Sequence, residues 1–164
     1  MPTPTIERAS PSAGERIHRI TKHSGVFTPE EVDCVQELWT EFLQQGEKSG
    51  YIFTVAREGD DVLGYACFGP VPLTAGVYDL YWIAVDPAAR GNGIGRALME
   101  QMEAEVKARG GRLILIETSG TLPYAPTRRF YESCGYRYQA VIHDFYAIGD
   151  DLITYGKVLV PATT

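Results

Sequence analysis

Several features that mark whole classes of protein are scarce in this sequence. The three cysteines are odd in number and far apart, which indicates neither a metal-ligand spacing nor a disulfide framework. Because Cys34, Cys67 and Cys134 all lie in apolar patterns, we expect small core residues. The longest apolar runs are far below the ~20 residues of a membrane-spanning helix, and no signal peptide is visible. We therefore expect a cytoplasmic protein that does not associate with a membrane.

Positive charge is also in short supply. Fifteen Lys and Arg face 21 Asp and Glu, which gives a formal net charge of −6 at pH 7. This balance argues against nucleic acid as the main partner and slightly favours cationic ligands such as amines. The 164 residues, with 45% hydrophobic and 11% aromatic side chains, are typical of one globular domain with one core.

The order of predicted elements indicates a mixed α/β sheet. Met1–Gly14 is rich in Pro, Ser and Thr, which predicts a disordered N-terminal tail before a single domain over residues 15–164. Hydrophobic periodicity and capping residues predict helices after Thr28, over Gly93–Ala108 and after Pro126. Strands are predicted at Ile17–Ile20, Tyr51–Arg57, Val62–Gly69, Tyr78–Val85, Leu113–Ile116, Tyr136–Tyr146 and Leu152–Val160.

The string VDPAARGNGIGRALM links the predicted strand Tyr78–Val85 to the helix Gly93–Ala108 through a glycine-rich turn. The first amides of a helix have no partner within it, and the helix dipole puts partial positive charge there. Glycines remove side chains, so a polyphosphate can lie against bare backbone. The sequence therefore predicts an anion site at this turn.

Three kinds of phosphate-binding turn compete for this segment. A P-loop needs Lys-Ser or Lys-Thr after its glycines, and neither pair is present. A dinucleotide fingerprint needs a third glycine where Arg96 stands. The pattern R-x-x-G-x-G fits at every position, as Arg90, Gly93 and Gly95. An ordinary strand-to-helix turn with chance glycines is the remaining alternative.

A second motif, RRFYESCGY, contains Phe130, Tyr131, Gly135 and Tyr136 near the end of a predicted short helix. With the R-x-x-G-x-G pattern, it makes residues 15–160 resemble the GNAT superfamily of acetyl-CoA-dependent N-acetyltransferases. The resemblance implies a GNAT-like fold, with a mostly antiparallel sheet that is splayed at the cofactor-binding strands and flanked by helices. One departure is that the usual two opening helices look compressed into one.

The resemblance also implies which residues hold acetyl-CoA. Backbone groups at the end of the strand would bind the pantetheine arm, and the turn would bind the pyrophosphate. Tyr124 stands where an Asn of the family often holds the arm, so that contact is expected to be missing or replaced. The implied cofactor-binding residues are Ile83, Ala84, Val85, Arg90, Gly91, Asn92, Gly93, Ile94, Gly95, Arg96 and Tyr124.

Three side chains are candidates for catalysis. Tyr131 matches the family tyrosine that gives its proton to the leaving thiolate; a phenol of pKa ~10 can supply a thiolate whose thiol titrates near ~8.5. A packing tyrosine is the alternative. The attacking amine, of pKa ~10.4, must lose a proton. Glu117, at the end of a buried strand, is the first candidate base and Asp79 the second. A structural carboxylate is the alternative for both.

The acceptor site should be lined by the first helix, the segment Pro70–Tyr78 and the last hairpin. Polar and aromatic residues that could bind an amine gather there: Tyr65, Phe68, Tyr78, Tyr81, His143, Asp144, Phe145 and Tyr146.

These patterns predict an enzyme that moves an acetyl group from acetyl-CoA to a primary amine of a small molecule, by direct attack and with no metal. The first alternative is a non-catalytic acyl-CoA-binding sensor of the same fold, which needs neither Tyr131 nor Glu117. A transferase for hydroxyl acceptors or longer acyl chains is the second. Because dimers are common in the family, a homodimer is a candidate assembly.

Overall fold

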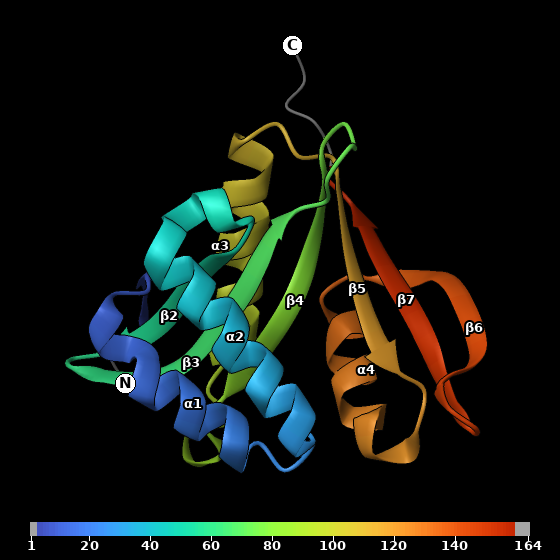
Figure 1. Ribbon diagram of the computed structural model, residues 1–164, viewed down its shortest axis with the longest axis horizontal. Helices are drawn as coiled ribbons and strands as arrows, with labels where there is room; N and C mark the ends of the chain where they lie inside the picture. Colours follow the sequence, from blue (N-terminus) through green and yellow to red (C-terminus); the bar gives the residue numbers. More distant parts are fainter. Residues whose placement is uncertain (1–2, 160–164) are drawn as a thin grey trace. The chain divides into compact units, whose positions relative to one another are not determined.

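A computed structural model describes residues 3–159 of the chain (Figure 1). Within this range the sheet has seven strands in the order β1-β2-β3-β4-β5-β7-β6. The strands are β1 Thr5–Arg8, β2 Ile52–Glu58, β3 Asp61–Pro70, β4 Val77–Val85, β5 Leu113–Ser119, β6 Arg137–Ala147 and β7 Asp150–Val158. The α-helices are α1 Gly14–His23, α2 Pro29–Gln45, α3 Ile94–Ala108 and α4 Ala125–Ser133. The predicted mixed α/β sheet is confirmed.

The chain divides into two compact units. The first comprises residues 1–69 and 81–102, and the second comprises residues 70–80 and 103–164. In the first unit β1 pairs with β2 and β2 with β3, all antiparallel. In the second, Val77–Leu80 of β4 run parallel to Leu113–Ile116 of β5, and β7 lies antiparallel between β5 and β6.

The first unit has an aromatic core between its helices and strands. In Figure 1, α1 and α2 lie across β2 and β3. Trp39 of α2 meets Phe53 of β2 edge to face, with ring centroids 5.1 Å apart. The Tyr65 hydroxyl shares a hydrogen bond of 2.6 Å with Thr21 of α1. Helix α2 starts at Thr28 in a capping box and ends before Gly46, which has φ +59°. The start of α2 follows the sequence prediction.

The strand predicted at Ile17–Ile20 is wrong, because these residues lie inside α1. Ile17, Ile20 and Thr21 are buried at spacings of three and four residues, which is the period of one helix face. A four-residue apolar segment carries too little periodicity to separate the two structures. The expected compression to one opening helix is also wrong, since α1 and α2 are both present.

The disordered tail predicted for residues 1–14 is wrong over the part that the structure describes. Residues Thr5–Arg8 form β1, in register with Arg57–Thr54 of β2. The next residue, Ala9, donates its amide to the Phe53 carbonyl at 2.9 Å. Arg57 pairs with Glu7 across the two strands. Strand pairing therefore orders a segment whose composition alone indicates little; residues 1–2 lie outside the described range.

The cysteine prediction holds for two of the three side chains. Cys67 on β3 and Cys134 after α4 are buried, whereas Cys34 on α2 is exposed. The buried face of α2 is formed by Val32, Val35, Trp39 and Phe42, and Cys34 falls outside it. Among the described residues, no helix is both long and apolar enough to cross a membrane.

Candidate active site

The glycine-rich turn of the first unit is held at its start by two side chains. Asp86 caps the short 3-10 helix Pro87–Ala89 by accepting the Ala88 amide at 3.0 Å. Arg16 of α1 donates to Asp86 Oδ2 at 2.6 Å and to the Val62 carbonyl at 2.9 Å. The hydrogen bond from Arg16, followed by that from the Ala88 amide, lowers the pKa of Asp86. The Asp86 carboxylate is therefore charged at neutral pH.

Two further side chains of the turn donate hydrogen bonds to backbone carbonyls of the same unit. Arg90 donates to the Ser24 carbonyl, beyond the end of α1, at 2.8 Å. Asn92 donates to the Ala89 carbonyl at 3.1 Å. In this structure Arg90 and Asn92 therefore set the path of the turn. Their predicted contact with a phosphate stays a prediction.

The glycines of the turn adopt backbone conformations that other residues rarely take. Gly91 has φ +84° and Gly93 has φ +75°. A Cβ built on either glycine would meet no heavy atom within 4 Å, so the space beside them is open. The Ala97 amide bonds the Gly93 carbonyl at 3.0 Å, which leaves Ile94, Gly95 and Arg96 in the first turn of α3. Bare backbone, open space and helix amides together suit an anion.

Close packing fixes α3 against the strands of the first unit. A Cβ on Gly64 of β3 would lie 3.0 Å from the Ala84 carbonyl oxygen and 3.2 Å from Ile94 Cγ2. Gly64 thus lets the start of α3 approach the sheet. Ala84 is buried, while its neighbours Ile83 and Val85 on β4 are half-buried. Gly64 is not predicted from the sequence, because a single glycine in a strand has many explanations.

Tyr131 lies on α4 in the second unit and is 6% exposed. Its ring lies 5.7 Å from that of Phe130 and 6.1 Å from that of Tyr155. Among the described residues its hydroxyl has no hydrogen-bond partner, whereas the buried Tyr136 donates to Glu103 at 2.9 Å. Burial, followed by the influence of Tyr124 and Cys134, raises the pKa of Tyr131. The phenol therefore keeps its proton at neutral pH.

Asp79 and Glu117 share one face of the sheet in the second unit. Asp79 of β4 pairs with Leu115 of β5, and Glu117 is two residues further along β5. Burial, followed by the charge of Glu117, raises the pKa of Asp79, and Glu117 itself is exposed. Within the described residues neither carboxylate accepts a hydrogen bond or forms an ion pair. This arrangement counts against a structural carboxylate fixed by arginine or amides.

Some of the residues predicted to line the acceptor site do not lie at the surface. Tyr65 and Phe68 are 0% exposed in the core of the first unit, so their prediction as lining residues is wrong. Alternation along β3 would bring only every second residue to one face, but the flanking helices bury both faces at these positions. Tyr81 packs against Tyr51 with ring centroids 5.4 Å apart. Tyr78 is half-buried.

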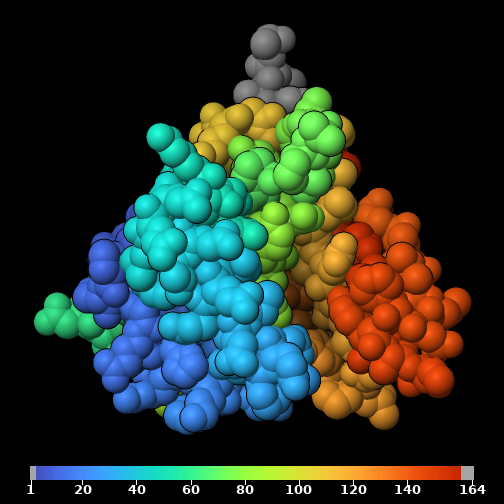
Figure 2. All heavy atoms as spheres, in the orientation of Figure 1, coloured from blue at the N-terminus to red at the C-terminus, as the bar shows by residue number. Residues whose placement is uncertain are grey.

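The last hairpin exposes its polar and aromatic residues. His143, Phe145 and Tyr146 lie on β6, whose described side chains are all exposed; Figure 2 shows the strand at the surface in orange. Asp151 accepts from the Asp144 amide at 2.9 Å and contacts His143 Nδ1 at 3.0 Å. The Asp144 amide, followed by His143, lowers the pKa of Asp151. These contacts hold Asp144 at φ +55° and fix the shape of the hairpin.

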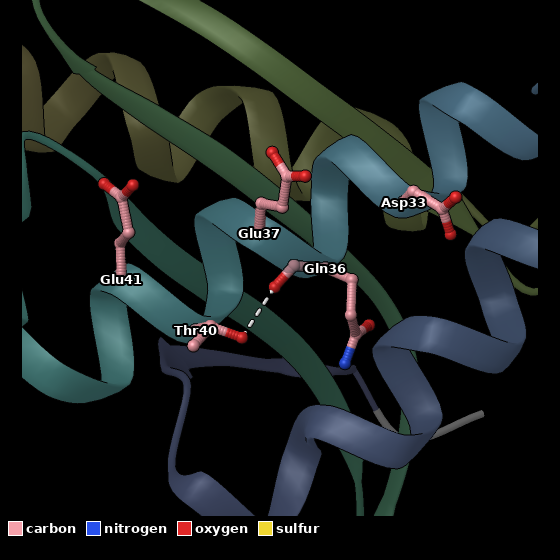
Figure 3. A pocket seen from close by; sticks show the side chains of 5 residues that line it. All are labelled: Asp33, Gln36, Glu37, Thr40 and Glu41. Atoms are coloured by element: carbon pink, nitrogen blue, oxygen red, sulfur yellow. Dashed lines mark hydrogen bonds between the residues drawn. The ribbon is translucent and has the colours of Figure 1, made fainter.

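Helix α2 carries an acidic surface depression that the sequence analysis did not identify (Figure 3). Its volume is about 550 Å³, and its lining residues are Asp33, Gln36, Glu37, Thr40 and Glu41. The three carboxylates recur every four residues, the spacing of one helix face, and this period was readable in the sequence. Thr40 donates to the Gln36 carbonyl at 2.9 Å. The negative charge suits cations rather than anions.

Comparisons with known proteins agree with this fold. Residues 16–136 match the model of the acetyltransferase (GNAT) family. A curated relative, the IAA acetyltransferase of Azospirillum brasilense, is 31% identical over 121 residues, or 72% of this chain and 75% of the relative. A crystal structure from Desulfovibrio desulfuricans, assigned to the GNAT family, is 47% identical; the match covers 94% of this chain and 98% of that one, with a TM-score of 0.92.

A more distant structure resembles the chain in fold alone. It comes from Salmonella typhimurium and was solved with its cofactor acetyl-CoA; it is 20% identical over 99% of this chain and 98% of its own, with a TM-score of 0.74. The family match and the 47% identical structure confirm the predicted GNAT-like fold. The chain therefore belongs to the GNAT family of acetyltransferases and is an acetyl-CoA-dependent acyltransferase.

Proposed function

We propose that the chain acetylates a primary amine of a small molecule, with Tyr131 as the general acid. The observation that carries this proposal is a buried tyrosine on α4 whose hydroxyl keeps its proton and makes no hydrogen bond among the described residues. A hydroxyl that no other side chain engages is open to a ligand. Such a group suits a proton donor that meets its acceptor only during the reaction.

The glycine-rich turn fits the polyphosphate of acetyl-CoA. A ligand as bulky as a pyrophosphate needs backbone without side chains, and the open space beside Gly91 and Gly93 provides it. The amides of Ile94, Gly95 and Arg96 in the first turn of α3 would bind the phosphate oxygens. Backbone groups of Ile83, Ala84 and Val85 would hold the pantetheine arm. Bound acetyl-CoA supplies a thioester, whose carbonyl the amine attacks and whose sulfur must leave as a thiol.

The chain's own residues would then handle two protons. Tyr131 donates its phenolic proton to the departing sulfur, because the neutral phenol is the form that burial favours. Asp79 or Glu117 attracts the cationic amine and takes its proton, either directly or through water. The raised pKa of Asp79 makes this carboxylate a better base than an ordinary aspartate.

A small cationic acceptor agrees with the charges of both units. The second unit offers two carboxylates without ion-pair partners in the described range, and the first has the acidic face of α2. A homodimer stays a prediction that sedimentation of the purified chain tests.

The substitution Tyr131→Phe tests the proposal, because it keeps the ring and removes only the acidic proton. With an amine that the wild-type chain acetylates, kcat should fall about 10²-fold while the Kd of acetyl-CoA is unchanged. A wild-type kcat, measured where the chemical step limits turnover, would make Tyr131 a packing residue. The non-catalytic sensor differs from both outcomes, since its wild-type chain binds acetyl-CoA and releases no thiol with any amine.

A further inference from the structure

We propose that Tyr155 is a positioning residue: its hydroxyl holds the last turn of α4 so that Tyr131 meets the departing sulfur. This inference rests on the proposed function, because it gives Tyr155 a role only through the proton of Tyr131. All residues involved belong to the second unit.

Tyr155 is joined to α4 by a ring contact and a hydrogen bond. It lies on β7 and is 0% exposed. Its ring centroid is 6.1 Å from that of Tyr131. Its hydroxyl donates at 2.9 Å to Oε1 of Glu132, the residue that follows Tyr131 on α4. One side chain of β7 thus touches the proposed acid and also binds the residue beside it.

A second ring also contacts Tyr155. Tyr138 of β6 stacks on it with ring centroids 4.9 Å apart and an interplanar angle of 29°. Because Tyr155 is fully buried and contacts both Tyr131 and Tyr138, its ring has little freedom to tilt. Its hydroxyl is therefore fixed in space and can serve as a reference point for α4.

A second attachment follows two residues further along β7. Lys157 donates from Nζ to the Cys134 carbonyl at 2.9 Å and to Glu103 Oε1 at 2.8 Å. Because alternate residues of a strand share one face, Tyr155 and Lys157 both point toward α4. Together they bind Glu132, in the last turn of α4, and Cys134, which directly follows that helix. The rotation of this short helix is consequently set by β7.

Helix rotation matters because the Tyr131 hydroxyl makes no hydrogen bond of its own in the described residues. Its place therefore depends on the backbone of α4 and on packing of the ring, which lies beside Phe130 and Tyr155. A misplacement of about 1 Å can cost ~10²-fold in rate. Loss of the bond between Tyr155 and Glu132 should therefore slow the chemical step even though neither residue reacts.

The test compares two substitutions that each remove one buried tyrosine hydroxyl. Tyr155→Phe breaks the bond to Glu132 on α4. The matched control Tyr136→Phe breaks a bond of the same length, 2.9 Å, to Glu103 on α3. Both should lower the melting temperature by a similar amount. Only Tyr155→Phe should lower kcat, by about tenfold, with the Kd of acetyl-CoA unchanged in both variants.

Glu132 supplies the reciprocal variants should Tyr155→Phe fail to fold. Glu132→Gln keeps an oxygen that accepts the tyrosine hydroxyl and should retain most of the wild-type kcat. Glu132→Ala removes that acceptor and should lower kcat as Tyr155→Phe does. Equal kcat in Glu132→Gln and Glu132→Ala would overturn the positioning role.

The double variant Tyr131→Phe/Tyr155→Phe separates this inference from the proposed function. If Tyr155 acts through the Tyr131 proton, the second substitution should add no further loss to Tyr131→Phe. A wild-type rate in Tyr131→Phe overturns the proposed function, and this inference with it. A slow Tyr131→Phe beside a Tyr155→Phe that matches its Tyr136→Phe control overturns the positioning role alone.

Discussion

The phosphate-binding role of the glycine-rich turn can be tested by a pair of substitutions at Gly93 that differ only in charge. Gly93→Asp and Gly93→Asn each place a short polar side chain at φ +75°, where a Cβ has open space. Asn and Asp are the residues that best tolerate this left-handed conformation. Each should therefore lower the free energy of unfolding by about 1 kcal/mol, and by nearly the same amount.

The two variants should bind acetyl-CoA very differently. A carboxylate about 5 Å from a phosphate is repelled by roughly 1 kcal/mol in bulk water and roughly 3 kcal/mol at an effective dielectric constant of 20. This range corresponds to a Kd that is ~5- to ~200-fold higher for Gly93→Asp than for Gly93→Asn. Isothermal titration calorimetry at low salt measures the difference, which should shrink as the salt concentration rises.

The salt series also separates charge from distortion of the turn. A distorted turn would weaken binding in both variants and would depend little on salt. Circular dichroism and thermal unfolding establish that both variants are folded. If folded Gly93→Asp and Gly93→Asn bind acetyl-CoA with the same Kd, the pyrophosphate does not lie on this turn.

Two further predictions concern the carboxylates. Glu117→Gln removes a charge at nearly constant volume, so kcat/KM for the amine should fall while the Kd of acetyl-CoA holds; an unchanged kcat/KM would contradict a role in acceptor capture or deprotonation. Asp79 has a raised pKa, so the folded state binds its proton more tightly than the unfolded state does. The Asp79 carboxyl therefore lowers the free energy of unfolding increasingly as the pH rises through that pKa. Asp79→Asn should therefore raise the melting temperature at pH 7 and not at pH 3, whereas a gain equal at both values would refute this electrostatic cause.

Structure is predicted most accurately from the sequence where residues close together in the chain determine it. The capping box at Thr28 gives the start of α2, because the side chains and amides that cap the helix are close in sequence. The glycine-rich string likewise predicts a turn before α3, and Gly93 adopts φ +75° there. In both cases the determining contacts lie within a few residues, so local sequence contains them.

Contacts between distant residues account for the errors. Strand β1 forms because residues 5–8 pair with β2, some 50 positions away in the sequence. The Pro- and Ser-rich composition of the N-terminal segment does not reveal that partner. The residue type of Tyr65 predicts a place in the acceptor site, yet its hydroxyl forms a hydrogen bond with Thr21 in the core. Residue type indicates what a side chain can do, whereas burial decides whether a substrate can reach it.

The candidate site shows the same difference between local patterns and contacts between distant residues. Tyr131 was found from a motif, but nothing in that motif states that its hydroxyl lacks a partner or that Tyr155 and Glu132 are joined beside it. Asp79 and Glu117 were chosen separately from two apolar strands. Their common face follows only from the parallel register of β4 and β5, which fixes Asp79 opposite Leu115.

The central claim is that the chain transfers an acetyl group to an amine, and the release of coenzyme A tests it most directly. Purified chain, acetyl-CoA and a panel of small primary amines are combined, and free thiol is followed with time beside the acetylated product. We predict thiol release that depends on one class of cationic amine, with one acetylated amine formed per thiol. Binding of acetyl-CoA without amine-dependent thiol release across the panel would contradict the claim and favour an acyl-CoA sensor.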